Sequence, residues 1–135
     1  MEPFCRLKKV KTLLVDDDEL IRDSLNLAFR LNSCFLQPVK TAEDGLKALK
    51  NEHFDIIISD FKLPQMDGLK FFKLVKTIHP NCLKVLISAC IDANTESEAF
   101  VSGAHKIIEK PFSIKALVES LNFLIETAEN DEGAL

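Results

Sequence analysis

Short runs of apolar residues alternate along the chain with stretches in which the apolar residues are spaced as on one face of a helix. Three runs show no alternation of polar and apolar residues: Leu13–Val15, Ile56–Ile58 and Val85–Ile87. Uninterrupted aliphatic runs of this length are typical of parallel strands that are buried on both faces of a sheet. We therefore expect these segments to form the centre of a parallel sheet.

Two weaker strands are expected at residues 35–39 and 106–109. The first contains Pro38, which has no N–H to donate to a sheet ladder. In the second, charged residues flank Ile107 and Ile108, and charges are common on edge strands. Both segments therefore suit the edges of the sheet.

Five further segments have the apolar spacing of amphipathic helices, near residues 19–29, 42–49, 69–79, 92–102 and 114–125. Ser113 is the expected N-cap of the last helix. The segment 92–102 has the weakest apolar support, so we expect it to be the least stable and most mobile helix. This alternation predicts an α/β fold. We expect a doubly wound, five-stranded parallel sheet in the flavodoxin-like order 2-1-3-4-5, flanked by five helices.

The composition is that of a single globular domain. The chain has 135 residues, of which 47% are hydrophobic and 28% charged, and its formal net charge is −4, so a wholly disordered chain is excluded. The mild acidity argues against a nucleic-acid-binding surface, and no apolar run is long enough to span a membrane. Cys5, Cys34, Cys82 and Cys90 have no CxxC or CxxH spacing. We therefore expect a cytoplasmic protein with reduced cysteines.

The two ends of the chain differ in composition from its middle. The polar and basic start lacks the apolar core of a secretory signal, and the last ten residues are acidic with little apolar content. We expect an N-terminal extension at residues 1–10, a folded domain at residues 11–126 and a frayed tail at residues 127–135.

Polar residues stand where four of the expected strands end. Asp16 and Asp17 follow the first strand, Asp60 the third, Ser88 the fourth and Lys110 the fifth. Because ligands bind outside the carboxyl ends of the strands in such sheets, we expect these side chains to meet there. Carboxylates that meet at one point repel one another unless a cation joins them, and oxygen ligands at a solvent-open site suit Mg²⁺.

These groups together suit the chemistry of phosphoryl transfer. One carboxylate is able to act as a nucleophile toward a phosphoryl donor and form an acyl phosphate. The hydroxyl of Ser88 and the ammonium of Lys110 are the types of group needed to hold the phosphoryl oxygens. An acidic residue at a helix start, such as Asp18, is explained by the helix dipole alone, but that explanation does not cover acidic residues at two strand ends.

Five short stretches occur in a fixed order along nearly the whole chain, from about residue 11 to 125. They are LLVDDDELIRDSL at 13–25, DIIISDFKLPQMDGL at 55–69, VLISA at 85–89, SGA at 102–104 and KPF at 110–112. In this combination they resemble the receiver domain of two-component response regulators, of the kind found in chemotaxis regulators. The combination is specific, whereas any one of the stretches alone is weak.

The resemblance implies a phosphoacceptor and a metal site. Asp60 is similar to the phosphoacceptor of the family. Asp17 resembles the direct Mg²⁺ ligand, while Asp16 resembles the acidic residue that acts mainly through water. The backbone carbonyl of Lys62 is implied as a further ligand of the metal, beside Asp60 itself.

The resemblance also implies a switch. Ser88 is similar to the hydroxyl residue that turns toward the phosphoryl group, and Lys110 to the lysine that pairs with it. Pro111 is expected to follow a cis peptide bond. Gly68 is expected to serve the turn after the loop 64–67, where a positive φ is cheap for glycine.

Three positions depart from the common pattern of the family. Ile107 stands where the family usually has an aromatic residue that rotates inward, so we expect the switch to be expressed through the fourth helix alone. Lys62 and Cys90 stand at positions from which a side chain influences the access of water to the phosphoryl group.

The resemblance implies a phosphorylation-activated signalling switch. A histidine kinase or phosphotransfer protein is the expected donor to Asp60, and the surface of helix 4, strand 5 and helix 5 is the expected output. That surface is expected to act on a downstream effector domain or protein, as in transcription regulation, or in a homodimer, to which exposed Phe123 is suited. Enzymatic activity is expected only as self-phosphorylation and slow autodephosphorylation.

Two other functions are compatible with parts of the pattern. A degenerate receiver would act as a constitutive protein-binding module, but it would lack the acceptor, the acidic pair or the lysine. A phosphohydrolase with an aspartyl-phosphate intermediate usually has a second carboxylate two residues past the nucleophile, and Lys62 stands there.

Overall fold

The computed structural model describes residues 2–134, and side chains for residues 2–130. Its centre is a five-stranded parallel sheet in the order β2-β1-β3-β4-β5. The strands are β1 (Lys11–Val15), β2 (Phe35–Val39), β3 (Ile56–Asp60), β4 (Leu83–Ser88) and β5 (Lys106–Glu109). The helices are the short 3₁₀ helix η1 (Leu7–Lys9), α1 (Glu19–Leu31), α2 (Ala42–Asn51), α3 (Gly68–Ile78), α4 (Ala93–Val101) and α5 (Ile114–Ala134). The predicted fold class, strand order and edge strands are confirmed.

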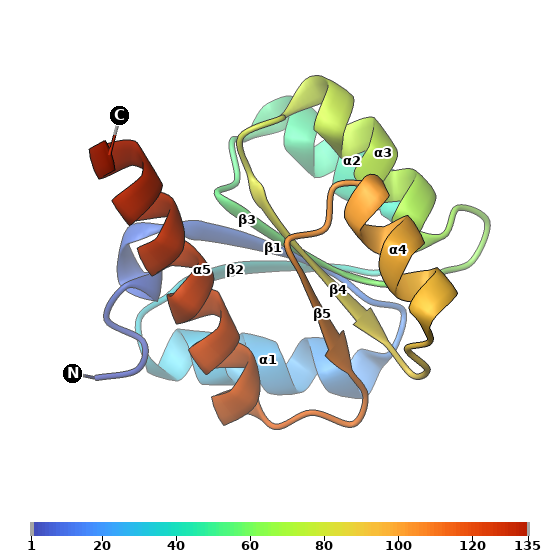
Figure 1. Ribbon diagram of the computed structural model, residues 1–135. Helices are drawn as coiled ribbons and strands as arrows, with labels where there is room; N and C mark the ends of the chain where they lie inside the picture. The colour runs from blue at the N-terminus through green and yellow to red at the C-terminus, as the bar shows by residue number, and fades with distance from the viewer. Residues whose placement is uncertain (1, 135) are drawn as a thin grey trace.

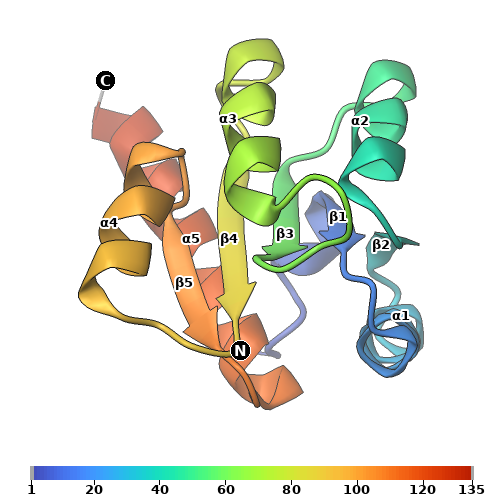
Figure 2. The ribbon, with the colours of Figure 1, turned by 90° about the vertical axis from the view of Figure 1, so that its right-hand side faces the viewer.

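Helices cover both faces of the sheet. Figures 1 and 2 show α1 and α5 on one face and α2, α3 and α4 on the other. Successive residues of β1 enter different cores: Leu14 packs with α1 and α5, whereas Leu13 and Val15 pack with α2 and α3. The central strands are uninterrupted apolar runs because both of their faces are buried.

Each long helix begins at a side chain that accepts a hydrogen bond from a backbone N–H of the first turn, as expected of an N-cap. The pairs are Asp18 with Leu20, Thr41 with Asp44, Asp67 with Lys70, Asp92 with Thr95 and Ser113 with Ala116. All five caps lie in loops that follow a strand, at the carboxyl edge of the sheet. Local capping therefore helps to fix the loops that carry the site.

The N-terminal segment, expected to be an extension, packs into the fold. Leu7 is fully buried in the core between α1 and α5. The ring of Phe4 meets that of Phe29 edge to face, with centroids 5.7 Å apart, and the side-chain amide of Asn122 donates to the carbonyl of Pro3 at 2.7 Å. Figure 1 shows this segment in dark blue, between α5 and the end of α1. The segment therefore adds apolar side chains to the core between α1 and α5.

At the other end of the chain, helix α5 continues to Ala134. The stretch from residue 127 is therefore helical, and its expected fraying stays a prediction. No proline interrupts this stretch, and Ala128 and Glu129 are good helix formers. In the described part of the chain, no helix is both long and apolar enough to cross a membrane.

Helix α4 has little support from the core. Within the described residues, the buried member of this helix is Ala99, while Phe100 and Val101 are 47% and 73% exposed. The low stability expected for this helix stays a prediction. The four cysteines are free: Cys34 and Cys82 are buried, Cys5 is half-buried and Cys90 is exposed.

Candidate functional site

The candidate site lies at the carboxyl edge of the sheet, where the arrowheads of Figure 2 end. Asp60 and Ser88 are the last residues of β3 and β4, Asp16 and Asp17 directly follow β1, and Lys110 directly follows β5. The parallel ladder aligns these strand ends: Asp60 pairs with Ile87, and Ser88 with Glu109. The structure therefore brings together the side chains that the sequence pattern placed there.

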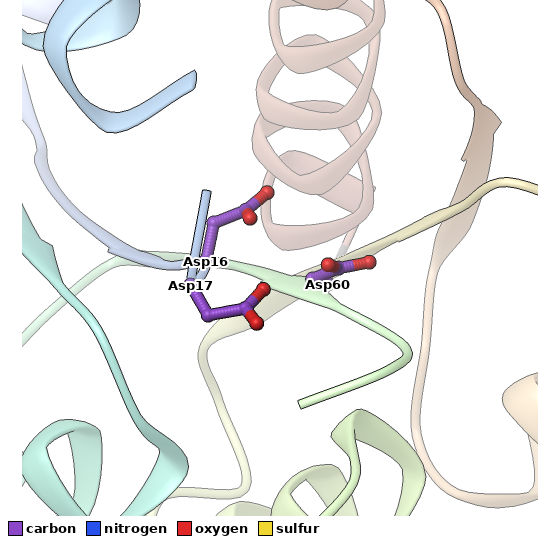
Figure 3. Close-up of side chains that lie close together, drawn as sticks. All are labelled: Asp16, Asp17 and Asp60. Atoms are coloured by element: carbon purple, nitrogen blue, oxygen red, sulfur yellow. The ribbon is translucent and has the colours of Figure 1, made fainter. Parts of the chain in front are cut away.

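Three carboxylates meet at this edge. Asp16, Asp17 and Asp60 each offer an oxygen atom, and these atoms all lie within 4.8 Å of one another. Figure 3 shows Asp16 and Asp17 extending from the end of β1 beside Asp60. Asp16 is fully buried and Asp60 is 7% exposed, whereas Asp17 is open to solvent.

Burial makes this cluster electrostatically unfavourable without a counter-ion. Desolvation raises the pKa of Asp16 above its ordinary value, and the nearby charge of Asp60 raises it further. Desolvation likewise raises the pKa of Asp60, with a contribution from Asp17, while Lys110 acts in the opposite direction. Among the described residues, no donor hydrogen-bonds to the buried Oδ2 of Asp16. A hard divalent cation such as Mg²⁺ fits a set of oxygen ligands of this kind.

Lys110 supplies the positive charge on the other side of the cluster. Its Nζ donates to Oδ2 of Asp60 at 3.1 Å and lies 3.5 Å from Oδ2 of Asp16. Burial alone would lower the pKa of Lys110, but the two carboxylates together raise it. The peptide bond between Lys110 and Pro111 is cis, as predicted, and Lys110 N–H donates to the carbonyl of Ser88 at 2.8 Å. The ammonium is therefore held at the strand end, beside Asp60.

Ser88 hydrogen-bonds to the backbone of Cys90 in this structure. Its hydroxyl donates to the carbonyl of Cys90 at 2.8 Å and accepts from the N–H of the same residue at 3.3 Å. Both residues line a cavity of about 250 Å³ that Asp60, Lys62 and Lys110 also line. The exposed Cys90 thus belongs to this cavity.

Gly68 is needed for a reason other than the one expected. The residue begins α3 and does not have a positive φ, which in the preceding loop belongs to Gln65, at 68°. A Cβ on residue 68 would lie 2.3 Å from the backbone oxygen of Asp60, and the N–H of Gly68 donates to the carbonyl of Phe61 at 2.8 Å. The expectation of a positive φ was wrong; the position requires glycine because the backbone behind Asp60 approaches so closely.

One residue near the site was missed by sequence reasoning. Nη1 of Arg22, the fourth residue of α1, donates to the backbone carbonyl of Asp16 at 2.9 Å. The only signal in the sequence was a basic residue six positions after Asp16, which is common on helix surfaces.

A second, larger groove lies beside the acidic cluster. It has a volume of about 470 Å³ and runs between α1 and the segment that joins β5 to α5. Its walls include Leu20, Ile21, Phe112 and Ile114, and Lys110 lines both this groove and the cavity at Asp60. The groove is mainly apolar and holds none of the three clustered carboxylates, so it suits contact with another molecule more than chemistry.

Comparisons with known proteins agree with this geometry. The model of the family described as the response regulator receiver domain matches residues 12–122. The DNA-binding transcriptional regulator NtrC of Proteus hauseri is 34% identical in an alignment 116 positions long, which covers 84% of this chain and 24% of that protein. The probable chemotaxis protein CheY of Rhizobium etli is 32% identical in an alignment 123 positions long, which covers 84% of this chain and 93% of that protein.

The solved structures lead to the same group of proteins. A CheY-like response regulator receiver domain protein from Methanospirillum hungatei JF-1 superposes with a TM-score of 0.85 at 25% identity, covering 90% of this chain and 98% of that one. The chain spans about a quarter of the length of NtrC and of two other regulatory proteins that it matches, FleR of Pseudomonas aeruginosa and DctD of Rhizobium meliloti.

Proposed function

Because the chain belongs to the family of response regulator receiver domains, we propose that it is a phosphorylation-dependent switch in which Asp60 accepts the phosphoryl group. The observation that carries this proposal is the position of Asp60 at the end of β3, close to the buried carboxylate of Asp16 and in an ion pair with the ammonium of Lys110. An ion pair between Asp60 and Lys110 that served only the fold would not require the carboxylates of Asp16 and Asp17 beside it.

The reaction is a transfer to a carboxylate. An oxygen of ionised Asp60 forms a bond to phosphorus while the bond from phosphorus to the donor breaks, and the donor leaves with the electron pair. Lys110 favours the ionised form of Asp60 against the effect of burial, and it stays beside the oxygens that carry charge afterwards. Bound Mg²⁺ would be held by Asp16, Asp17, Asp60 and the backbone carbonyl of Lys62, and would neutralise part of the charge of an incoming phosphoryl group.

Ser88 and Lys110 are the residues that respond to the phosphoryl group. To donate to a phosphoryl oxygen, the hydroxyl of Ser88 has to leave the carbonyl of Cys90, which it contacts at 2.8 Å. This exchange releases the loop that leads into α4, a helix with a single described buried residue, Ala99. Phosphorylation thereby shifts the population of arrangements of α4 without any rotating aromatic ring at Ile107.

A switch of this kind needs two kinds of protein partner, a phosphoryl donor and an effector. The apolar groove between α1 and the β5–α5 segment lies next to Lys110, so a histidine kinase or phosphotransfer protein that reaches Asp60 is able to cover it. The output surface is formed by α4, β5 and α5, where Phe100 and Phe123 are exposed. An effector domain or protein, or a second copy of the chain, would bind there. Free cysteines fit the reducing cytoplasm as the place of action.

The test is the intact mass of the chain after incubation with Mg²⁺ and acetyl phosphate. The expected result is a gain of about 80 Da that is lost on standing, because an acyl phosphate hydrolyses. Asp60→Asn should show no gain, whereas Asp44→Asn, which changes an exposed carboxylate on α2, should behave as the wild type.

A different outcome would support the second function. If the wild type binds Mg²⁺ in calorimetry but gains no mass, the switch proposal is contradicted for small donors. The chain would then be a receiver that needs a dedicated kinase, or one that acts as a constitutive protein-binding module, which the isoleucine at position 107 favours.

A further inference from the structure

Arg22 connects the first helix to the acidic cluster through the backbone. Its guanidinium reaches back along α1, and Nη1 donates to the carbonyl oxygen of Asp16 at 2.9 Å. The bond is partly buried, and a charged donor makes a stronger hydrogen bond to a carbonyl than a neutral one does. The side chain therefore holds a backbone atom of the loop between β1 and α1.

The carbonyl that Arg22 holds belongs to the peptide group between Asp16 and Asp17. The N–H of Asp16 donates to the carbonyl of Val39 at 3.1 Å, and its Oδ1 accepts from the N–H of Asp18 at 2.9 Å. Because a peptide group is planar, fixing its carbonyl oxygen restricts the directions in which the two neighbouring side chains leave the backbone. Arg22 thus constrains both carboxylates that the strand end contributes to the cluster.

We propose that Arg22 is a positioning residue for divalent-cation binding, acting through the Asp16 carbonyl and touching neither the cation nor the phosphoryl group. This inference rests on the proposed function, in which the acidic cluster binds Mg²⁺. A positioning role and a purely electrostatic role predict opposite changes in Mg²⁺ affinity when Arg22 is replaced. A cation near a metal site repels the metal, so the loss of a merely adjacent positive charge would tighten binding. The loss of a positioning contact weakens it.

The experiment measures Mg²⁺ binding directly by isothermal titration calorimetry, since the chain contains no Trp or Tyr whose fluorescence would report binding. Arg22→Met removes the donor and the charge but keeps an unbranched apolar stem. Arg22→Lys keeps a charge and a donor. Arg30→Met makes the same change at an exposed site farther along α1. Circular dichroism confirms that each variant is folded.

Arg22→Met should weaken Mg²⁺ binding about tenfold, as the loss of outer contacts to metal ligands commonly does. Arg22→Lys should restore much of the affinity, and Arg30→Met should leave it within about twofold of the wild type. With acetyl phosphate, the Mg²⁺ concentration for half-maximal phosphorylation should rise in Arg22→Met, while the rate at saturating Mg²⁺ stays near that of the wild type.

The outcomes separate this inference from the function on which it rests. Unchanged or tighter Mg²⁺ binding by Arg22→Met overturns the positioning role alone, and so does equal weakening in Arg30→Met. If the wild type itself binds no Mg²⁺, both the inference and the metal-dependent function are overturned.

Discussion

Asp60 and Gly68 are eight residues apart in the sequence, yet a Cβ on residue 68 would lie 2.3 Å from the carbonyl oxygen of Asp60. The atom in the way is backbone at the end of β3, so it cannot move without displacing Asp60. Glycine at the start of α3 therefore lets that helix pack directly behind the site. The constraint is steric, and it acts on the residue that carries the proposed chemistry.

This constraint predicts the effect of a single methyl group. Gly68→Ala should lower the free energy of unfolding by about 1–3 kcal/mol, because overpacking against fixed atoms is destabilising. The matched control is Gly45→Ala in α2, where the nearest atoms belong to the side chains of Phe71 and Val15, at 3.0 and 3.1 Å. Urea denaturation should show a clearly larger loss for Gly68→Ala, and equal losses would contradict the steric explanation.

At the scale of elements, the N-terminal segment and α5 depend on each other. The segment places Phe4 and Leu7 between α1 and α5, and the amide of Asn122 in α5 holds the carbonyl of Pro3. Arg6 also lies 4.0 Å from Glu129 on α5. The receiver core thus extends to residues before β1, and truncation at residue 10 would expose apolar surface on both helices.

Leu7→Ala tests this dependence. The substitution should lower the free energy of unfolding by about 2–5 kcal/mol, since it removes a fully buried leucine side chain and leaves a cavity. Leu27→Ala is the control, because Leu27 is 58% exposed on the outer face of α1 and its loss should cost no more than about 0.5 kcal/mol. Similar midpoints in urea for the two variants would show that the segment does not support the core.

At the scale of the whole molecule, we expect stability to depend on pH through His105, at the entry to β5. Its Nδ1 accepts a hydrogen bond from the N–H of Lys84 at 3.0 Å, so the imidazole has to be neutral at this atom. Burial lowers the pKa of His105 below its ordinary value of 6.5, and the charge of Lys84 lowers it further. A folded-state pKa below the unfolded one gives stability that is present above about pH 6.5 and is lost as the pH falls.

The lowered pKa of His105 predicts that the wild type and His105→Asn differ in how their free energy of unfolding changes with pH. His105→Asn removes the titration and keeps an oxygen atom that accepts hydrogen bonds. Between pH 7.5 and 5.5, the wild type should therefore lose more unfolding free energy than the variant, as measured by urea denaturation at each pH. Parallel pH profiles would mean that His105 keeps its ordinary pKa in the folded protein.

Much of the site was readable from the sequence because its determinants are local. Polar residues at strand ends necessarily share one edge of a parallel sheet, so Asp16, Asp17, Asp60, Ser88 and Lys110 were found by position in the pattern. The edge strands were correctly assigned because proline and charge act on the ladder in which they stand. The glycine at position 68 was identified, but the reason was wrong, because the backbone atom that it must accommodate comes close only when α3 packs against the end of β3.

The remaining features needed the tertiary structure. Lys84 lies in β4 and is buried, with Nζ donating to the carbonyl of Cys82 at 3.2 Å, although a lysine beside an apolar run normally marks an exposed position. Leu7 and Arg22 carry no local signal, since an isolated leucine near a terminus and a basic residue on a helix are ordinary. The spacing of apolar residues, the helix N-caps and the polar residues at strand ends depend on interactions over a few residues, so they can be predicted from the sequence. Which distant side chain covers a core, or reaches a particular carbonyl, depends on how the helices pack against the sheet, and only the folded chain decides it.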